Sequence, residues 1–137
     1  MIIGIGNDLV SVKRIKNTYS KFGSRFEKRV YSHDELRLIW NRGSPCFKTL
    51  SNRWAVKEAF VKALGTGVKY GVLLKDISTL NNSNGKPVLI IRGYAKIYLS
   101  NLLPSNSTPF FHVSISDEKD FVNAVVIIES RDIIFKN

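Results

Sequence analysis

The stretch of residues 51–64 constrains the fold most strongly, because it consists largely of good helix formers and is followed by two glycines, Gly65 and Gly67. This pattern predicts a long helix that ends at Gly65. The 137 residues contain no internal repeat, no low-complexity tract and no linker long enough to divide them. A chain of this length suits one compact core, so we expect a single domain over residues 1–137.

Shorter elements are predicted before this helix. Residues 1–6 form an aliphatic strand, and apolar residues at helical spacing over 12–22 predict a helix that stops at Gly23. Two further helices are predicted from pairs with capping-box spacing, Ser24 with Glu27 and Ser32 with Glu35. The region before the long helix is therefore expected to be a helical block.

The region after the long helix is predicted to be mainly strands. We expect strands at 77–80 and 87–91 around an Asn-rich turn, a helix at 94–103, and a closing hairpin of strands 110–116 and 121–129. A helical block enclosed by strands and closed by a hairpin favours an α+β fold with a largely antiparallel sheet.

The formal net charge of +10 is unevenly distributed. One acid, Glu27, stands among the basic residues of the N-terminal helical region, which are Lys13, Arg14, Lys16, Lys21, Arg25, Lys28 and Arg29. Positive potential of this kind attracts phosphates, nucleic acids and acidic proteins. We therefore expect one face of this region to meet an anion.

The positive charge also suggests an alternative function, that of a small nucleic-acid-binding module. The aromatic residues of the same region fall on apolar helical faces, whereas RNA-binding sheets present aromatic residues as a stacking platform. We therefore expect no nucleic-acid partner.

Composition also indicates the cellular compartment in which the protein works. The lone Cys46 offers neither an intramolecular disulfide nor a multi-cysteine metal site, which suits a reducing cytoplasm. The longest strongly apolar run, 124–128, is far short of the ~20 residues that a membrane-spanning helix needs. The opening residues reach Asp8 too early for a secretory signal. We expect a cytoplasmic protein that does not span a membrane.

Two carboxylates are candidates for catalytic or metal-binding residues, and each also has a purely structural explanation. Asp8 follows the first strand and a turn there could present it at the sheet edge, but an acid in this place is usually a helix cap or turn residue. Glu58 precedes Lys62 by four residues, the spacing of an exposed helical ion pair worth ~0.3–0.5 kcal/mol. Trp54 one turn earlier and the Gly-Thr-Gly exit instead favour a shaped surface that a ligand can approach closely.

Magnesium binds one or two carboxylates and completes its octahedron with water and phosphate oxygens, so Asp8 and Glu58 could form such a pair. Lys62 beside them would act as a point charge on a phosphate. His112, Ser114 and Ser116 share one face of a predicted strand. That stripe could line a phosphate or ribose pocket, or simply face solvent.

Taken together, these segments resemble a known family. IGNDLV at 5–10 and WAVKEAFVKALG at 54–65 resemble the two-part signature of 4′-phosphopantetheinyl transferases, specifically the small holo-acyl-carrier-protein synthases. The NGKP turn at 84–87 and the HVSIS strand at 112–116 resemble the same family, so the likeness spans nearly the whole chain. Asn7 departs from the pattern, since relatives usually carry a hydrophobic residue or threonine there. The departure leaves both carboxylates intact.

The resemblance implies an enzyme that moves the 4′-phosphopantetheine arm of coenzyme A onto a serine of apo-acyl carrier protein, in support of fatty acid biosynthesis. It implies that Asp8 and Glu58 bind Mg²⁺, that Lys62 contacts the phosphate being transferred, and that Glu58 is the base, directly or through water. It further implies a coenzyme A pocket formed by Arg53, Lys57, Lys62, Gly65, Gly85, Lys86, Pro87 and His112.

The resemblance also implies an assembly and a docking surface. The family pattern suggests a homotrimer with active sites at subunit interfaces. Acyl carrier proteins are acidic, so their acidic helix is expected to dock on the basic first helix. Arg14, Lys21 and Arg25 are the candidate contacts.

Overall fold

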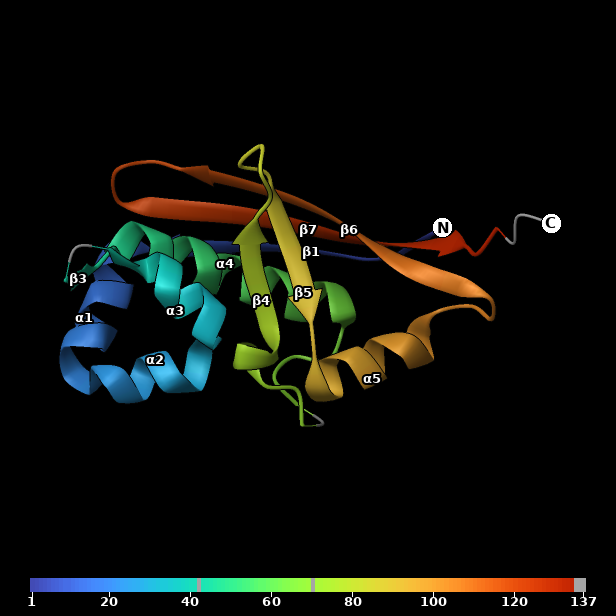
Figure 1. Cartoon of the computed structure of the whole chain (residues 1–137), viewed down its shortest axis with the longest axis horizontal. Helices are drawn as coiled ribbons and strands as arrows, with labels where there is room; N and C mark the ends of the chain where they lie inside the picture. The colour runs from blue at the N-terminus through green and yellow to red at the C-terminus, as the bar shows by residue number, and fades with distance from the viewer. Residues whose placement is uncertain (42, 70, 135–137) are drawn as a thin grey trace.

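The computed structural model describes residues 1–41, 43–69 and 71–134 (Figure 1). In chain order the elements are β1 (Ile2–Ser11), α1 (Val12–Phe22), α2 (Ser24–Val30), α3 (His33–Ile39), β2 (Trp40–Asn41), β3 (Ser44–Pro45), α4 (Phe47–Leu64), the 3-10 helix η1 (Leu74–Asp76), β4 (Ile77–Asn81), β5 (Pro87–Ile91), α5 (Gly93–Leu102), β6 (Ser107–Asp117) and β7 (Phe121–Asp132).

The strands form antiparallel sheets, as the sequence predicts. A three-stranded sheet has the order β1-β7-β6, while β4 with β5 and β2 with β3 form separate two-stranded hairpins. Figure 1 shows the helices on one side of the three-stranded sheet. The α+β prediction is confirmed.

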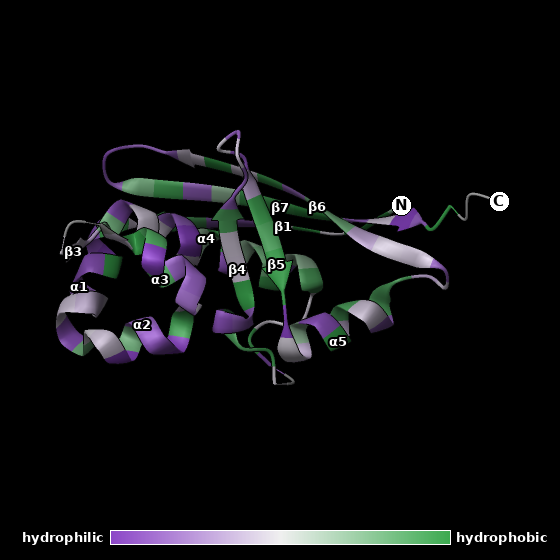
Figure 2. Cartoon of the chain, in the orientation of Figure 1, coloured by the Kyte–Doolittle hydropathy of each residue, from purple (hydrophilic) through white to green (hydrophobic). Residues whose placement is uncertain are grey.

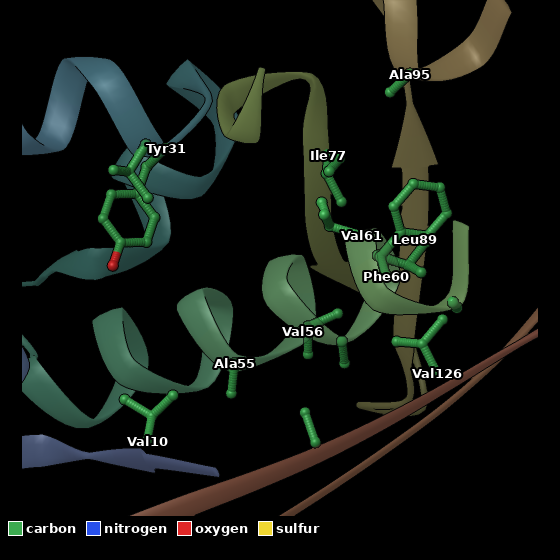
Figure 3. Close-up of a cluster of buried hydrophobic side chains, with 14 of the residues drawn as sticks. Val10, Tyr31, Ala55, Val56, Phe60, Val61, Ile77, Leu89, Ala95 and Val126 are labelled. Carbon is green, nitrogen blue, oxygen red and sulfur yellow. The ribbon is translucent and has the colours of Figure 1, made fainter. Parts of the chain in front are cut away.

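Helix α4 lies at the centre of this arrangement. It packs on β1 and β7 on one side and on α1, α3 and β4 elsewhere. In Figure 3, Val10 from β1 and Val126 from β7 approach α4 from the sheet side, and Ile77 from β4 approaches it from the other. All three belong to one cluster of buried hydrophobic residues. Because α4 is covered on several sides, Val61, one turn after Glu58, is buried.

Two glycines let β1 lie directly against α4. A Cβ atom at Gly4 would come within 1.9 Å of the carbonyl oxygen of Ala63, and one at Gly6 within 1.8 Å of that of Ala59. No side chain fits between the two backbones at these points. Side chains alternate along a strand, so Asp8 lies on the same face of β1 as Gly6 and points toward α4.

Strand β1 is longer than predicted, which changes the setting of Asp8. The strand continues to Ser11 because its second half pairs with the start of β7, with Asp8 opposite Ala124. Asp8 therefore lies within a strand and not in a turn after it. Ser11 is the cap residue of α1, and its hydroxyl accepts a hydrogen bond from the backbone N–H of Arg14.

One of the two predicted capping boxes is present. Ser32 and Glu35 form it at the start of α3. The pair of Ser24 and Glu27 does not, because Gly23 caps α2 and no side chain bonds to that end. The Glu27 carboxylate instead accepts a hydrogen bond from Trp40 Nε1 at 2.6 Å.

The remaining element boundaries are close to those predicted. Helix α4, however, begins at Phe47, a turn earlier than expected, and neither the β2–β3 hairpin nor η1 was predicted. Figure 2 shows hydrophilic residues along α1, α2 and α3, whereas β5 is mainly hydrophobic. Among the described residues, no helix combines the length and the apolar character needed to cross a membrane.

The close contact between β1 and α4 can be tested at Gly6. We expect Gly6→Ala to lower the free energy of unfolding by about 1–3 kcal/mol, because the added methyl group forces the two backbones apart. Urea denaturation measures this, with Thr108→Ala on the exposed side of β6 as the control. Equal stability of the two variants would show that the glycine contact is not needed.

Candidate active site

Asp8 on β1 and Lys62 on α4 form an ion pair at the surface between these elements. Lys62 Nζ donates to Asp8 Oδ1 at 2.9 Å and to the carbonyl oxygen of Asn7 at 2.9 Å. The Asp8 side chain is 14% exposed and that of Lys62 is 54% exposed. Lys62 therefore forms its ion pair with Asp8 on β1. The predicted ion pair between Lys62 and Glu58 within the helix is not found among the described residues.

Glu58 lies within electrostatic reach of this pair. Partial burial raises the pKa of its carboxyl group, and the negative charge of Asp8 raises it further, while Lys62 and Arg14 act in the opposite direction. Two carboxylates that repel each other in a partly dehydrated place favour a shared cation or a shared proton. The fold thus brings Asp8 of β1 together with Glu58 and Lys62 of α4, which the sequence placed on a separate segment.

The donor set at this site fits magnesium. Two carboxylates with open surroundings leave positions for water and phosphate oxygens, as Mg²⁺ requires. Within the described part of the chain, no group of three His, Cys, Asp or Glu side chains converges on one point, so a closed site built only from protein ligands is not formed there. Asp8 and Glu58 could hold the ion only together with a substrate that supplies oxygens.

Glu58 also lines an open cavity of about 640 Å³. Most of its wall is apolar, and Phe26 and Trp54 pack against each other there with ring centroids 5.8 Å apart. Arg25 and Arg29 from α2 contribute positive charge. The sequence marked Arg25 as a partner contact but did not mark Arg29 or Phe26, because nothing in the helical periodicity of α2 says which way that helix faces.

A second cavity of about 410 Å³ collects three of the residues predicted for the coenzyme A pocket, Arg53, Gly85 and Pro87. Ser114 on β6 also lines it. Arg53 is 6% exposed and donates one hydrogen bond to Asn81 Oδ1, yet its Nε has no partner. Burial lowers the pKa of the Arg53 guanidinium. A cation in the wall of this cavity suits an anionic ligand.

Besides Lys57 and Lys62, three predicted pocket residues, His112, Gly65 and Lys86, line neither of these cavities. His112 lies on the exposed side of β6, where its Nε2 is 2.6 Å from Glu129 Oε2. Hydrogen bonds from Arg131 and then His112 lower the pKa of Glu129 to about 2. Gly65 ends α4 in the left-handed conformation, and the backbone N–H of Lys86 donates to Asn82 Oδ1 in the turn. For these residues a contact with coenzyme A stays a prediction.

Lys57 is placed differently from its prediction. Its side chain is fully buried, and its amine donates to Glu35, to the carbonyl oxygen of Leu74 and to that of Ile77. Burial lowers the pKa of this ammonium group, while Glu35 opposes the change. With every donor used inside the fold, Lys57 has none left for a ligand, so we assign it no direct contact with coenzyme A.

The predicted docking residues lie at or near the first cavity. Arg14 and Lys21 are exposed on α1, and the Lys21 ammonium lies 5.2 Å from the centroid of the Phe22 ring. Arg25 is exposed at the start of α2 and lines the cavity with Phe22. The side chain of Asn7 exchanges hydrogen bonds with Asn123 on β7, so this departure from the family pattern does not disturb Asp8.

Comparison with known proteins gives a consistent result. Residues 4–125 match the family described as the 4′-phosphopantetheinyl transferase superfamily. The holo-[acyl-carrier-protein] synthase of Erythrobacter litoralis is 41% identical over 133 residues, covering 97% of this chain and 100% of that protein. The synthase of Ruegeria sp. is 41% identical, covering 98% and 94%.

Solved structures with similar folds carry the same description. The holo-[acyl-carrier-protein] synthase from Neisseria meningitidis aligns with a TM-score of 0.82 and 36% identity, covering 94% of this chain and 99% of that one. The Bacillus anthracis synthase in complex with CoA (3′,5′-ADP) aligns with a TM-score of 0.75 and 31% identity, covering 96% and 99%.

The electrostatic link between Asp8 and Glu58 predicts opposite effects of two substitutions. Asp8→Asn removes a negative charge and should lower the pKa of Glu58, whereas Lys62→Met removes a positive charge and should raise it. Carbon-13 NMR titration of the Glu58 carboxyl group without divalent cations measures both. An unchanged pKa in Asp8→Asn would mean that the two carboxylates do not share one site.

Proposed function

Because the chain belongs to the 4′-phosphopantetheinyl transferase superfamily, we propose that it transfers the 4′-phosphopantetheine arm of coenzyme A to a serine of apo-acyl carrier protein. The observation that carries this proposal is the placement of Asp8, Glu58 and Lys62 together where β1 meets α4, in a chain that matches the family over residues 4–125. We place the reaction in the cytoplasm and in fatty acid biosynthesis.

The chemistry follows from these side chains. The serine oxygen forms a bond to the β-phosphorus of coenzyme A as the bond from that phosphorus to the bridging oxygen breaks, and 3′,5′-adenosine bisphosphate leaves. Glu58, whose pKa is raised, accepts the serine proton directly or through water. Lys62 neutralises charge on the phosphate oxygens.

Magnesium would be held by Asp8 and Glu58. When bound, it supplies positive charge to the pyrophosphate, which is the main requirement of a phosphoryl-type transfer. The mutual repulsion of the two carboxylates supports this assignment, since a divalent cation relieves it. Lys62, now paired with Asp8, can turn to the phosphate because its side chain is more than half exposed.

The second cavity is the candidate pocket for the nucleotide end of coenzyme A. The positive charge of Arg53 in the cavity wall supports this role, and the turn at Gly85 and Pro87 lines the same cavity. None of the described residues lines both cavities. A complete site therefore needs the two cavities to be brought together.

A homotrimer with active sites shared between neighbouring subunits would bring the two cavities together. The face of the three-stranded sheet turned away from α4 exposes large apolar side chains, namely Ile5, Leu9, Phe110 and Phe121. Exposed apolar patches of this kind are typical of interfaces. Self-association over this face would cover these residues and place one subunit beside the next.

Mass spectrometry of an apo-acyl carrier protein incubated with this protein, coenzyme A and Mg²⁺ tests the transfer itself. A gain of one phosphopantetheine on the serine is expected. A carrier protein of unchanged mass in every condition would reject the proposal.

Loss of either carboxylate should abolish transfer without unfolding the protein. We expect Asp8→Asn and Glu58→Gln each to reduce kcat by about 100-fold or more, because each removes a charged group from the reacting site while keeping its shape. Asp132→Asn, an exposed acid at the end of β7, is the control. Wild-type rates in either site variant at limiting Mg²⁺ would overturn the metal assignment.

The acidic carrier protein is proposed to dock on α1 and the start of α2, through Arg14, Lys21 and Arg25. Charge reversal by Lys21→Glu should raise the KM for carrier protein, and more so at low salt, because such charges act within a Debye length of ~8 Å at physiological salt. The KM for coenzyme A should not change. Lys96→Glu on α5 is the matched control. If Lys21→Glu altered coenzyme A binding as much as carrier binding, α1 would belong to the nucleotide pocket.

A further inference from the structure

The interior contains an ion pair that has no part in the chemistry above. Lys57 Nζ lies 2.7 Å from Glu35 Oε2, and both side chains are 0% exposed. The same amine donates to the carbonyl oxygens of Leu74 and Ile77. Glu35 in turn accepts from the backbone N–H of Ser32 through Oε2 and from that of Thr79 through Oε1. The donors of the amine and both carboxylate oxygens are therefore occupied.

These bonds connect three parts of the chain. Glu35 lies in the first turn of α3, Lys57 lies in the middle of α4, and the carbonyl groups belong to η1 and the start of β4. One ammonium group thus fixes the segment that leads into β4 relative to the central helix.

Both sides of this connection reach the first cavity. Glu58 follows Lys57 directly in α4, and Leu73 and Leu74 line the cavity from the opposite segment together with Val68. One wall of the cavity is α4 at Glu58 and the other is the segment of Leu73 and Leu74. The hydrogen bonds of Lys57 therefore set the distance between these two walls. A shift of either wall would move Glu58 relative to whatever occupies the cavity.

Stability alone gives a weak reason for such a pair. Replacing a buried ion pair with apolar residues of similar volume is often neutral or stabilising, since removing two charges from water costs as much as their attraction returns. Apolar residues could fill the same space, but they could not hold the carbonyl groups of Leu74 and Ile77 in place. What the ion pair adds is a fixed geometry.

We propose that Glu35 and Lys57 are positioning residues for the transfer, which hold the wall formed by Leu73 and Leu74 at a fixed place relative to Glu58. The inference rests on the proposed function and deepens it. Neither residue contacts the substrate. Their effect is on the position of Glu58 relative to the part of the substrates that the first cavity holds, and therefore on kcat.

The test compares Lys57→Met with the double variant Glu35→Gln/Lys57→Met. The single change leaves the Glu35 carboxylate buried without its cation and should lower Tm strongly, whereas the double change leaves no unpaired charge and should recover most of that loss. In the double variant we expect kcat to stay about 10- to 100-fold below wild type, because misaligned reacting groups lose rate steeply. The KM for coenzyme A should not change.

A second readout separates positioning from general loosening. Amide hydrogen exchange over residues 71–77 should be faster in the double variant, while that of β6 and β7 stays as in the wild type. Asp34→Asn is the control, because Asp34 precedes Glu35 on α3 but pairs at the exposed surface with Arg92, at 3.8 Å. This variant should match the wild type in all readouts.

The outcomes are distinct. If wild type and Asp34→Asn transfer nothing, the proposed function fails. If both transfer normally and the double variant recovers kcat together with Tm, Glu35 and Lys57 are structural only and the positioning role is rejected. Failure of both variants to fold would likewise make the pair a requirement for folding alone and reject the proposal.

Discussion

The backbone contact between β1 and α4 is the constraint on which the site depends. Gly4 and Gly6 carry no side chains, so the strand approaches the helix until carbonyl oxygens of α4 occupy the space of the missing Cβ atoms. Asp8 lies two residues beyond Gly6 on the same face of the strand, and therefore reaches Lys62 at 2.9 Å. A larger separation between the two elements would leave each charged group to water, and the electrostatic effect of Asp8 on Glu58 would be lost.

Helix α4 carries different kinds of residue on different sides because each side meets a different neighbour. Alanines face the strand, Lys57 is enclosed by α3 and the start of β4, and Glu58 and Lys62 remain accessible between the sheet and the first cavity. Acidic residues at the site and basic residues on α1 and α2 then occupy adjacent regions. This separation of charge suits the proposed function, in which a cation and a phosphate bind in one place and an acidic protein docks in another.

Much of the fold and the central part of the site could be predicted from the sequence. The α+β class followed from the order of helical and strand patterns, and Asp8, Glu58 and Lys62 followed from residue type together with the family resemblance. The predictions that failed concern features that depend on tertiary contacts. The end of β1 could not be placed, because Asp8 to Ser11 are held in the strand by pairing with β7. The resemblance placed Lys57 in the coenzyme A pocket, and its burial could not be foreseen, because its partner Glu35 lies 22 residues earlier and only packing brings the two together. The first cavity was missed for the same reason, since it is lined by α1, α2, α4 and the segment before β4.

The central claim is that Asp8 and Glu58 form one metal-dependent site for the pyrophosphate of coenzyme A. A crystal structure with coenzyme A and Mg²⁺ tests it most directly. We predict one ion bound by both carboxylates and by pyrophosphate oxygens, with Lys62 turned from Asp8 to the phosphate. Coenzyme A bound elsewhere, with no ion between the carboxylates and with the pair of Asp8 and Lys62 intact, would contradict the account.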